Sequence, residues 1–101
     1  MIKVKTTVMP KNLVIMAACA NVAEAMGIEV VVTSGKDSKH MMGSKHYAGN
    51  ALDIRSKNFK SYEDKLLYLD AVMERLGEKY QGILEFVDTP NEHFHIEYDP
   101  D

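Results

Sequence analysis

The four histidines of this 101-residue chain fall into two separate segments. His40 and His46 precede Asp53 in the middle of the chain, and His93 and His95 lie near its end. Imidazole nitrogens and carboxylate oxygens are common zinc ligands, and a catalytic zinc typically takes three protein ligands and leaves a fourth position for water. His46, Asp53 and His95 could supply such a set, so the sequence suggests metal-assisted hydrolysis.

The residues around Asp53 predict a strand that directs this carboxylate away from the protein core. In residues 51–55, Leu52 and Ile54 share one face of an extended chain, and Asp53 and Arg55 share the other. The apolar pair is expected to face the core, which places Asp53 where a site could be. Arg55 could then form a salt bridge or bind a substrate carboxylate.

The two histidine segments must meet in space if they form one site. Gly49 permits a tight turn that returns His46 toward Asp53. His93 and His95 are two residues apart, so a strand places them on one face. Either segment alone is more often structural, because short motifs have many false positives. Both segments in a chain with four histidines favour a metal site.

Both segments also match the motifs of a known family. Residues 44–53 read SKHYAGNALD and fit the pattern S-x-H-x-x-G-x-A-x-D, and residues 92–95 read EHFH and fit E-x-x-H with an embedded H-x-H. In these motifs the chain resembles the D-alanyl-D-alanine carboxypeptidase and L-alanyl-D-glutamate endopeptidase family of zinc peptidases. That family includes phage endolysins and shares its zinc-site architecture with the Hedgehog signalling domain. The resemblance runs from about residue 30 to residue 98.

The resemblance implies Zn²⁺ as the cofactor and a role for each matching residue. Zinc lowers the pKa of its bound water and polarises the scissile carbonyl, and a general base takes the proton of the attacking water. Carried onto this sequence, the family pattern assigns zinc binding to His46, Asp53 and His95, the role of the base to Glu92, substrate binding to Ser44, and support of the site or of the developing oxyanion to His93.

A second glutamate competes for the role of the base. In a regular strand, Glu92 points away from His93 and His95, and it can serve only if Pro90 makes the backbone irregular there. Glu97 shares the face of His95. It could act as the base or hold the ligand histidine in place through a hydrogen bond.

The residue that grips the substrate departs from the family pattern. Many members carry an arginine soon after the Ser-Gly pair found here at residues 34–35, but this chain continues with Lys36 and an aspartate. Lys36, Lys39 and Arg55 are the candidate cations for this role. His40 either lines the cleft or caps the loop.

Hydrophobic periodicity predicts the elements that position these residues. Residues 2–8 alternate loosely and suggest a short strand, and residues 29–33 form a β-branched run typical of a buried strand. The stretch 10–26 has a helical pattern that ends at Gly27. Its mostly apolar side carries Leu13, Met16, Ala17, Ala20 and Glu24.

The second half of the chain predicts a loop, a helix and three strands. Residues 36–50 lack a period and form a loop, and the alternating residues 51–55 form a strand. A helix starts after Ser61 as N-cap and runs to about residue 79, with Tyr62, Leu66, Leu69, Met73 and Leu76 at helical spacing. Residues 83–87 and 94–98 form two strands joined by a turn-rich linker.

These elements make residues 1–101 a single domain of the α+β class. The order is β-α-β-loop-β-α-β-β, which indicates a small mixed or antiparallel sheet with two main helices. The family resemblance narrows this to the zinc fold of the Hedgehog and DD-peptidase type.

Composition argues against several other classes. The formal net charge is −3 and the cations are scattered, which disfavours nucleic-acid binding. No apolar run is long enough to span a bilayer, and the N-terminus lacks the apolar stretch of a secretory signal. We therefore expect synthesis in the cytoplasm, and the family resemblance implies action on the bacterial cell wall after release. Cys19 is the single cysteine and is predicted to be a small buried hydrophobe.

The leading functional prediction is a peptidoglycan peptidase of the phage lysis type. It would act as a DD-carboxypeptidase or as an L-Ala-D-Glu endopeptidase on stem peptides. The alternatives are a cytoplasmic D-Ala-D-Ala dipeptidase, and a non-catalytic zinc module that binds a peptide or protein and has lost its base. A metal-free structural domain is disfavoured, because it would bring two polar clusters together without a partner for them.

Overall fold

Two helices and five strands make up the part of the chain that the computed structural model describes, residues 2–4, 12–34 and 51–99. Their order confirms the predicted α+β succession. Along the chain they are β1 (Ile2–Val4), α1 (Leu13–Met26), β2 (Val30–Ser34), β3 (Ala51–Arg55), α2 (Tyr62–Leu76), β4 (Tyr80–Glu85) and β5 (His93–Tyr98).

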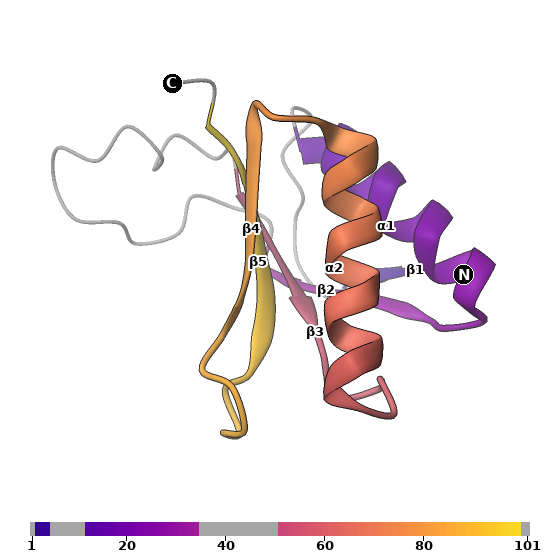
Figure 1. Ribbon diagram of the computed structural model, residues 1–101, viewed down its shortest axis with the longest axis vertical. Coiled ribbons are helices and arrows are strands. Elements are labelled where there is room, and N and C mark those ends of the chain that lie inside the picture. Colours follow the sequence, from indigo (N-terminus) through magenta and orange to yellow (C-terminus); the bar gives the residue numbers. More distant parts are fainter. Residues whose placement is uncertain (1, 5–11, 35–50, 100–101) are drawn as a thin grey trace, which may run out of the picture.

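The five strands form one mixed sheet, as predicted, in the spatial order β1-β2-β3-β5-β4. β1 runs parallel to β2, and every other neighbouring pair is antiparallel. Both helices lie on the same side of the sheet (Figure 1). The sheet therefore has a face covered by α1 and α2, and a second face without these helices, which we call the outer face.

The first helix ends where the sequence predicted but buries a different side. Gly27 adopts φ 72° and its N–H donates to the carbonyls at the end of α1, so the left-handed conformation that glycine tolerates terminates the helix. The prediction that Leu13 and Ala17 lie on the core side is wrong, since both are exposed. Almost every residue of α1 is apolar, so periodicity could not select a face. The buried side carries Ile15, Ala18, Cys19, Val22 and Ala23.

The second helix confirms its predicted start and ends slightly earlier than expected. The Ser61 side chain accepts a hydrogen bond from the Asp64 N–H at 3.1 Å, as an N-cap does. The helix stops at Leu76, before residue 79. Of the predicted apolar positions, Leu69, Met73 and Leu76 pack on the core, whereas Tyr62 and Leu66 are exposed. Tyr68 is fully buried. No helix within residues 12–34 and 51–99 is long and apolar enough to cross a membrane.

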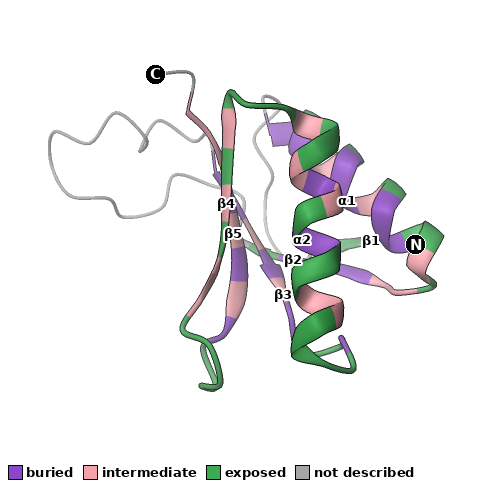
Figure 2. Ribbon diagram, viewed as in Figure 1, coloured by how far each residue is buried: buried purple, intermediate pink, exposed green. Residues whose placement is uncertain are grey.

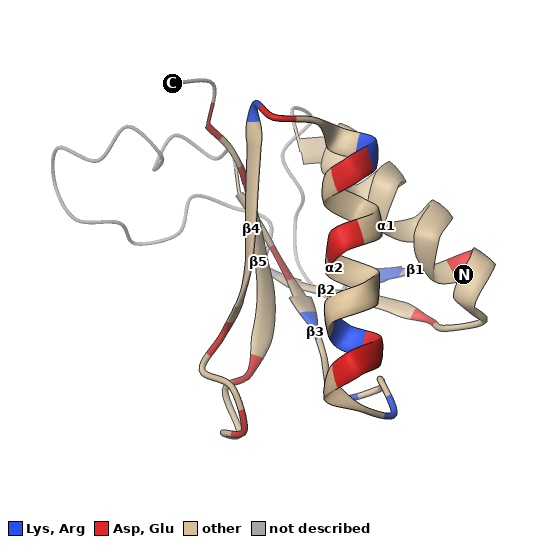
Figure 3. Ribbon diagram, viewed as in Figure 1, with Lys and Arg blue, Asp and Glu red and all other residues tan. Residues whose placement is uncertain are grey.

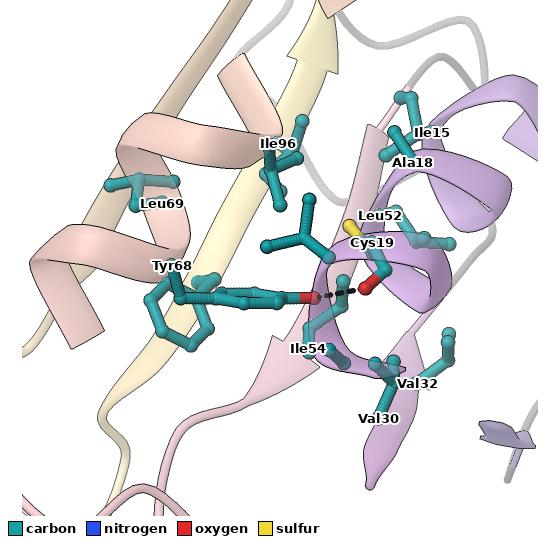
Figure 4. Close-up of a cluster of buried hydrophobic side chains, with 14 of the residues drawn as sticks. Ile15, Ala18, Cys19, Val30, Val32, Leu52, Ile54, Tyr68, Leu69 and Ile96 are labelled. Atoms are coloured by element: carbon teal, nitrogen blue, oxygen red, sulfur yellow. Dashed lines mark hydrogen bonds between the residues drawn. The ribbon is translucent and has the colours of Figure 1, made fainter. Parts of the chain in front are cut away.

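The core lies between the two helices and the inner face of the sheet (Figure 2). Tyr68 crosses it and donates its hydroxyl hydrogen bond to the Cys19 carbonyl at 2.9 Å, which links α2 to α1 (Figure 4). The Tyr68 ring also contacts Phe59 and Phe94, with ring centroids 4.8 Å and 5.2 Å away. Cys19 is fully buried, as predicted, and burial raises the pKa of its thiol to about 12.

Three strand boundaries of the β4–β5 hairpin differ from the prediction, and the first is the start of β4 at Tyr80 and not at residue 83. Phe86 and Asp88 have φ values of 53° and 63°, which lie in the left-handed region. An extended strand cannot continue through such residues, so β4 ends at Glu85 and not at residue 87. β5 begins at His93, one residue earlier than predicted. Both histidines near the end of the chain therefore lie within a regular strand.

Gly82 provides a test of how closely α2 packs on β4. A Cβ atom at this position would lie 2.6 Å from the sulfur of Met73 and 3.0 Å from a methyl carbon of Leu69. Replacing Gly82 with valine should lower the free energy of unfolding by about 1–3 kcal/mol, because both side chains must move. Chemical denaturation measures this change.

Gln81→Val is the matched control, because residue 81 is exposed on the same strand. Its stability should stay within about 0.5 kcal/mol of the wild type. Equal stabilities for the two valine variants would contradict the close packing at Gly82.

Candidate metal centre

Strand pairing brings together two of the three predicted metal ligands. β3 and β5 run antiparallel, and their register places Asp53 directly opposite His95. Leu52 and Phe94, which alternate with them, are fully buried on the helix side. Asp53 and His95 therefore project from the outer face. The alternation predicted for both segments is confirmed.

The contacts of His95 match those of a metal-ligating histidine. Its Nδ1 lies 2.7 Å from Oδ1 of Asp53, and its Nε2 lies 2.9 Å from Oε1 of Glu97. A ligating histidine typically donates its second ring N–H to a carboxylate, which fixes the tautomer and the ring orientation. Glu97 occupies that position, so its geometry matches the predicted orienting role.

The same contacts stabilise the protonated imidazole of His95. The hydrogen bond to Asp53 is the largest influence, and it raises the pKa of His95 to about 9 against the opposing effect of burial. Metal binding through Nδ1 requires the proton on that nitrogen to leave. Asp53 is therefore placed to bind either a proton-bearing histidine or a metal ion shared with it.

His93 lies beside this pair on the outer face. Its Nε2 is 3.8 Å from Oδ2 of Asp53 and 3.0 Å from Oε1 of Glu85, which stands opposite it on β4. Its Nδ1 donates to the backbone carbonyl of Asn91 at 2.7 Å. The two histidines of β5 therefore lie among the carboxylates of Asp53, Glu85 and Glu97. Figure 3 shows the acidic positions of the chain in red. Sequence reasoning did not single out Glu85.

Glu92 lies on the other face of the sheet. Its side chain is buried, with Oε1 accepting hydrogen bonds from Ser56 and Lys65 and Oε2 accepting one from the Asp88 N–H. The hydrogen bonds from Lys65 and then Ser56 lower the pKa of Glu92 to about 2. Glu92 also lines a small hollow beside Asp53, but its carboxylate oxygens are bound by Ser56, Lys65 and the Asp88 N–H.

This small hollow has a volume of about 230 Å³ and adjoins Asp53, one of the paired ligands. Asp53, Glu92, His93, Arg55 and Lys57 are among the residues that line it. Arg55 is one of the predicted substrate-binding residues, whereas the sequence did not point to Lys57. A larger hollow of about 520 Å³ lies on the other side of Arg55, between the end of α1 and the start of α2. Neither Asp53 nor a histidine lines it. The smaller hollow is therefore the better candidate for the place where the reacting part of a substrate binds.

The other predicted site residues lie outside the described part of the chain. They include the third metal ligand, His46, and within the described segments no three such donors are arranged as a metal site. The donors that are described, one imidazole and one carboxylate, fit the predicted zinc set. The substrate-binding candidates that lie outside are Ser44, His40, Lys36 and Lys39.

No protein-family model, curated protein or solved structure matches this chain. The family assignment therefore stays a prediction from the motifs, and the geometry of Asp53, His95 and Glu97 bears on function independently of it.

Sequence reasoning also missed two residues, Glu85 and Lys65, and the sequence contains only part of the information needed to find them. Glu85 shares a face with Ile83 and alternates with Leu84 in the predicted strand 83–87, so its face could be inferred but not its neighbour on β5. Lys65 lies in the predicted helix, where it resembles any solvated lysine. Its pairing with Glu92 depends on how α2 is placed over the sheet.

The position of Glu92 predicts a structural role that can be measured. Glu92→Gln keeps the volume of the side chain but removes its charge from Lys65 and Ser56, so the free energy of unfolding at pH 7 should fall by about 1–3 kcal/mol. A carboxyl whose pKa is lowered on folding stabilises the protein above its unfolded pKa of about 4.3, and that stability is lost as the pH falls toward the folded value. Chemical denaturation at several pH values checks both points.

The stability gap between wild type and Glu92→Gln should therefore narrow between about pH 5 and pH 2. Glu74→Gln, at an exposed position of α2, is the matched control and should show no such gap. A Glu92→Gln protein as stable as the wild type at pH 7 would rule out the structural role.

Proposed function

We propose that this protein is a zinc-dependent peptidase that hydrolyses peptide bonds in peptidoglycan stem peptides. Three lines of argument support the proposal: the two sequence motifs, the pairing of Asp53 with His95, and the hollow beside Asp53 that Arg55 and Lys57 help to line. His46 is the proposed third ligand.

The contact set of His95 is the observation that carries the proposal. One ring nitrogen faces a potential co-ligand, Asp53, and the other faces an orienting carboxylate, Glu97. An ordinary structural histidine needs one hydrogen-bond partner, whereas two carboxylates on opposite sides of one imidazole fix both its position and its orientation. The exposed fractions of the His95 and Glu97 side chains are both 12%, which keeps the pair largely out of bulk water.

The chain's own residues have defined tasks in this proposal. Bound zinc supplies a water of lowered pKa and an electrophile for the carbonyl. Asp53 and His95 hold the ion, Glu97 holds His95, and His93 stands at the edge of the hollow where a carbonyl oxygen could accept a hydrogen bond. Arg55 and Lys57 line the hollow and are the cations that could bind a substrate carboxylate there.

The position of Glu92 favours a second candidate function, a non-catalytic zinc module that binds a peptide or a protein. That alternative requires a site without its base, and the carboxylate predicted as the base is bound by Lys65 and Ser56 on the opposite face. Cleavage of stem peptides by the wild type separates the two functions. Loss of cleavage in Glu92→Gln, under conditions where this variant is folded, would support Glu92 as the base.

The finer assignments follow the resemblance. We propose a DD-carboxypeptidase or an L-Ala-D-Glu endopeptidase that acts on the bacterial cell wall as a phage lysis enzyme. A D-Ala-D-Ala dipeptidase of the cytoplasm is the alternative enzyme. Mass analysis of the products from purified peptidoglycan, defined stem peptides and free D-Ala-D-Ala assigns the bond.

Metal analysis tests the proposed ligands. The purified protein should bind about one zinc ion per chain, and a chelator should abolish cleavage until zinc is restored. Asp53→Asn, His95→Ala and His46→Ala should each lose tight zinc binding. Glu97→Gln should weaken it by about 10- to 100-fold, because the orienting carboxylate is lost.

Asp70→Asn is the matched control for Asp53→Asn, because Asp70 is exposed on α2. It should retain zinc and activity. Wild-type zinc affinity in Asp53→Asn would refute the metal centre. Zinc binding by the wild type without cleavage of any of these substrates would refute the peptidase and favour the binding module.

The cations of the hollow predict how the enzyme selects its substrate. Arg55→Gln should raise KM by about 10- to 100-fold for stem peptides with a free terminal carboxylate, because a charge-assisted hydrogen bond is lost. Lys57→Gln should act in the same direction with a smaller effect. Lys60→Gln, at an exposed cation of the same connection, should leave KM unchanged. An unchanged KM in Arg55→Gln would exclude this residue from substrate binding.

A further inference from the structure

The His93 ring is held from several directions. Oε1 of Glu85 lies 3.0 Å from its Nε2, and the Asn91 carbonyl accepts a hydrogen bond from its Nδ1 at 2.7 Å. The ring of Phe86 stands beside it, with centroids 5.9 Å apart. A surface histidine kept for solubility would need none of these contacts.

The turn after Glu85 adds a second observation. Phe86 adopts φ 53°, a left-handed conformation that is strained for an aromatic residue, and its side chain stays 60% exposed. Strain of this kind tends to occur at functional sites, where the surrounding structure maintains it. Here the strained turn directly follows Glu85 and directs an exposed aromatic ring toward His93.

The contacts of His93 also connect it to the proposed metal ligands. Its Nε2 is 3.8 Å from Oδ2 of Asp53, whose other oxygen contacts His95. His93 therefore has an orienting carboxylate of its own, as His95 has in Glu97. Glu85 does not line the hollow beside Asp53, whereas His93 does.

We infer that Glu85 is a positioning residue of the peptidase site: its carboxylate holds the His93 imidazole beside Asp53, at the edge of the substrate hollow. This inference rests on the proposed function for its catalytic consequence. Without the Glu85 carboxylate, the His93 ring keeps its Nδ1 bond to the Asn91 carbonyl but loses the partner that fixes the direction of Nε2. The Nε2–H, whose nitrogen lies 3.8 Å from Oδ2 of Asp53, then loses the fixed position from which it could also donate to a developing oxyanion.

The kinetic test compares Glu85→Ala and Glu85→Gln with the wild type on the stem peptide that the wild type cleaves. Glu85→Ala should lower kcat by about 10- to 100-fold with KM within about twofold, because the orienting carboxylate is lost outside the substrate hollow. Glu85→Gln should lose less, since its amide oxygen still accepts a hydrogen bond. Zinc content and the thermal unfolding midpoint should match the wild type.

Glu78→Gln, an exposed glutamate just before β4, is the control and should leave kcat unchanged. Wild-type kcat in Glu85→Ala would overturn the inference. Loss of zinc in Glu85→Ala would overturn it as well, because Glu85 would then support the metal and not His93. The inference would also be overturned if kcat fell only in proportion to the fraction of folded protein.

A second readout needs no activity. In protein with ¹⁵N-labelled histidine rings, both Glu85 variants should shift the Nε2 resonance of His93 and leave the resonances of His95 in place. Single histidine substitutions assign the signals. If the wild type cleaves none of the tested substrates, the proposed function fails, and these spectra still decide whether Glu85 positions His93. An unchanged His93 resonance in Glu85→Ala would overturn the inference.

Discussion

The antiparallel register between β3 and β5 is the constraint on which both the core and the candidate site depend. Asp53 stands opposite His95, Ile54 opposite Phe94, and the side chains alternate between the two faces. Because the side-chain period of a strand is two, a shift of one residue would move every side chain of β5 to the other face. It would bury both histidines and expose Phe94. The fully buried Ile54 and Phe94 therefore fix the position of the proposed metal ligands, although neither contacts the site.

Two carboxylates close in sequence illustrate how the strand separates structural from chemical roles. Glu92 faces α2, where its bonds to Lys65 and Ser56 connect the start of β5 to the helix and to the end of β3. A buried pair of this kind adds little net stability, but breaking it leaves a charge without a partner. Glu97, on the opposite face, holds His95. The first carboxylate sets where β5 begins, and the second sets how a side chain on β5 is oriented.

The sequence predicted most of what depends on local pattern. The strand around Asp53, the N-cap Ser61 and the helix end at Gly27 are confirmed, because each depends on residues close in the chain. The buried side of α1 was predicted wrongly, since a helix that is apolar all round carries no amphipathic signal. The pairing of Asp53 with His95 needed the strand order, which no local pattern contains. The same holds for Glu85 beside His93 and for Lys65 beside Glu92. The motif predicted that Asp53 and His95 bind zinc together. The direction of the Glu92 side chain, by contrast, follows from the alternation of side chains along a strand.

The charge balance of the outer face favours a cation at the candidate site. Asp53, Glu85 and Glu97 gather around two imidazoles, and the carboxylates raise the pKa of His95 to about 9. The proton on Nδ1 of His95 thus partly neutralises the negative charge of this face. A divalent ion bound by Asp53 and His95 would replace that proton and supply more positive charge at the same place. Arg55 and Lys57 line the hollow beside Asp53, so two fixed cations lie near the same carboxylate. An anionic substrate group in the hollow would therefore meet cations of the protein as well as the proposed metal ion.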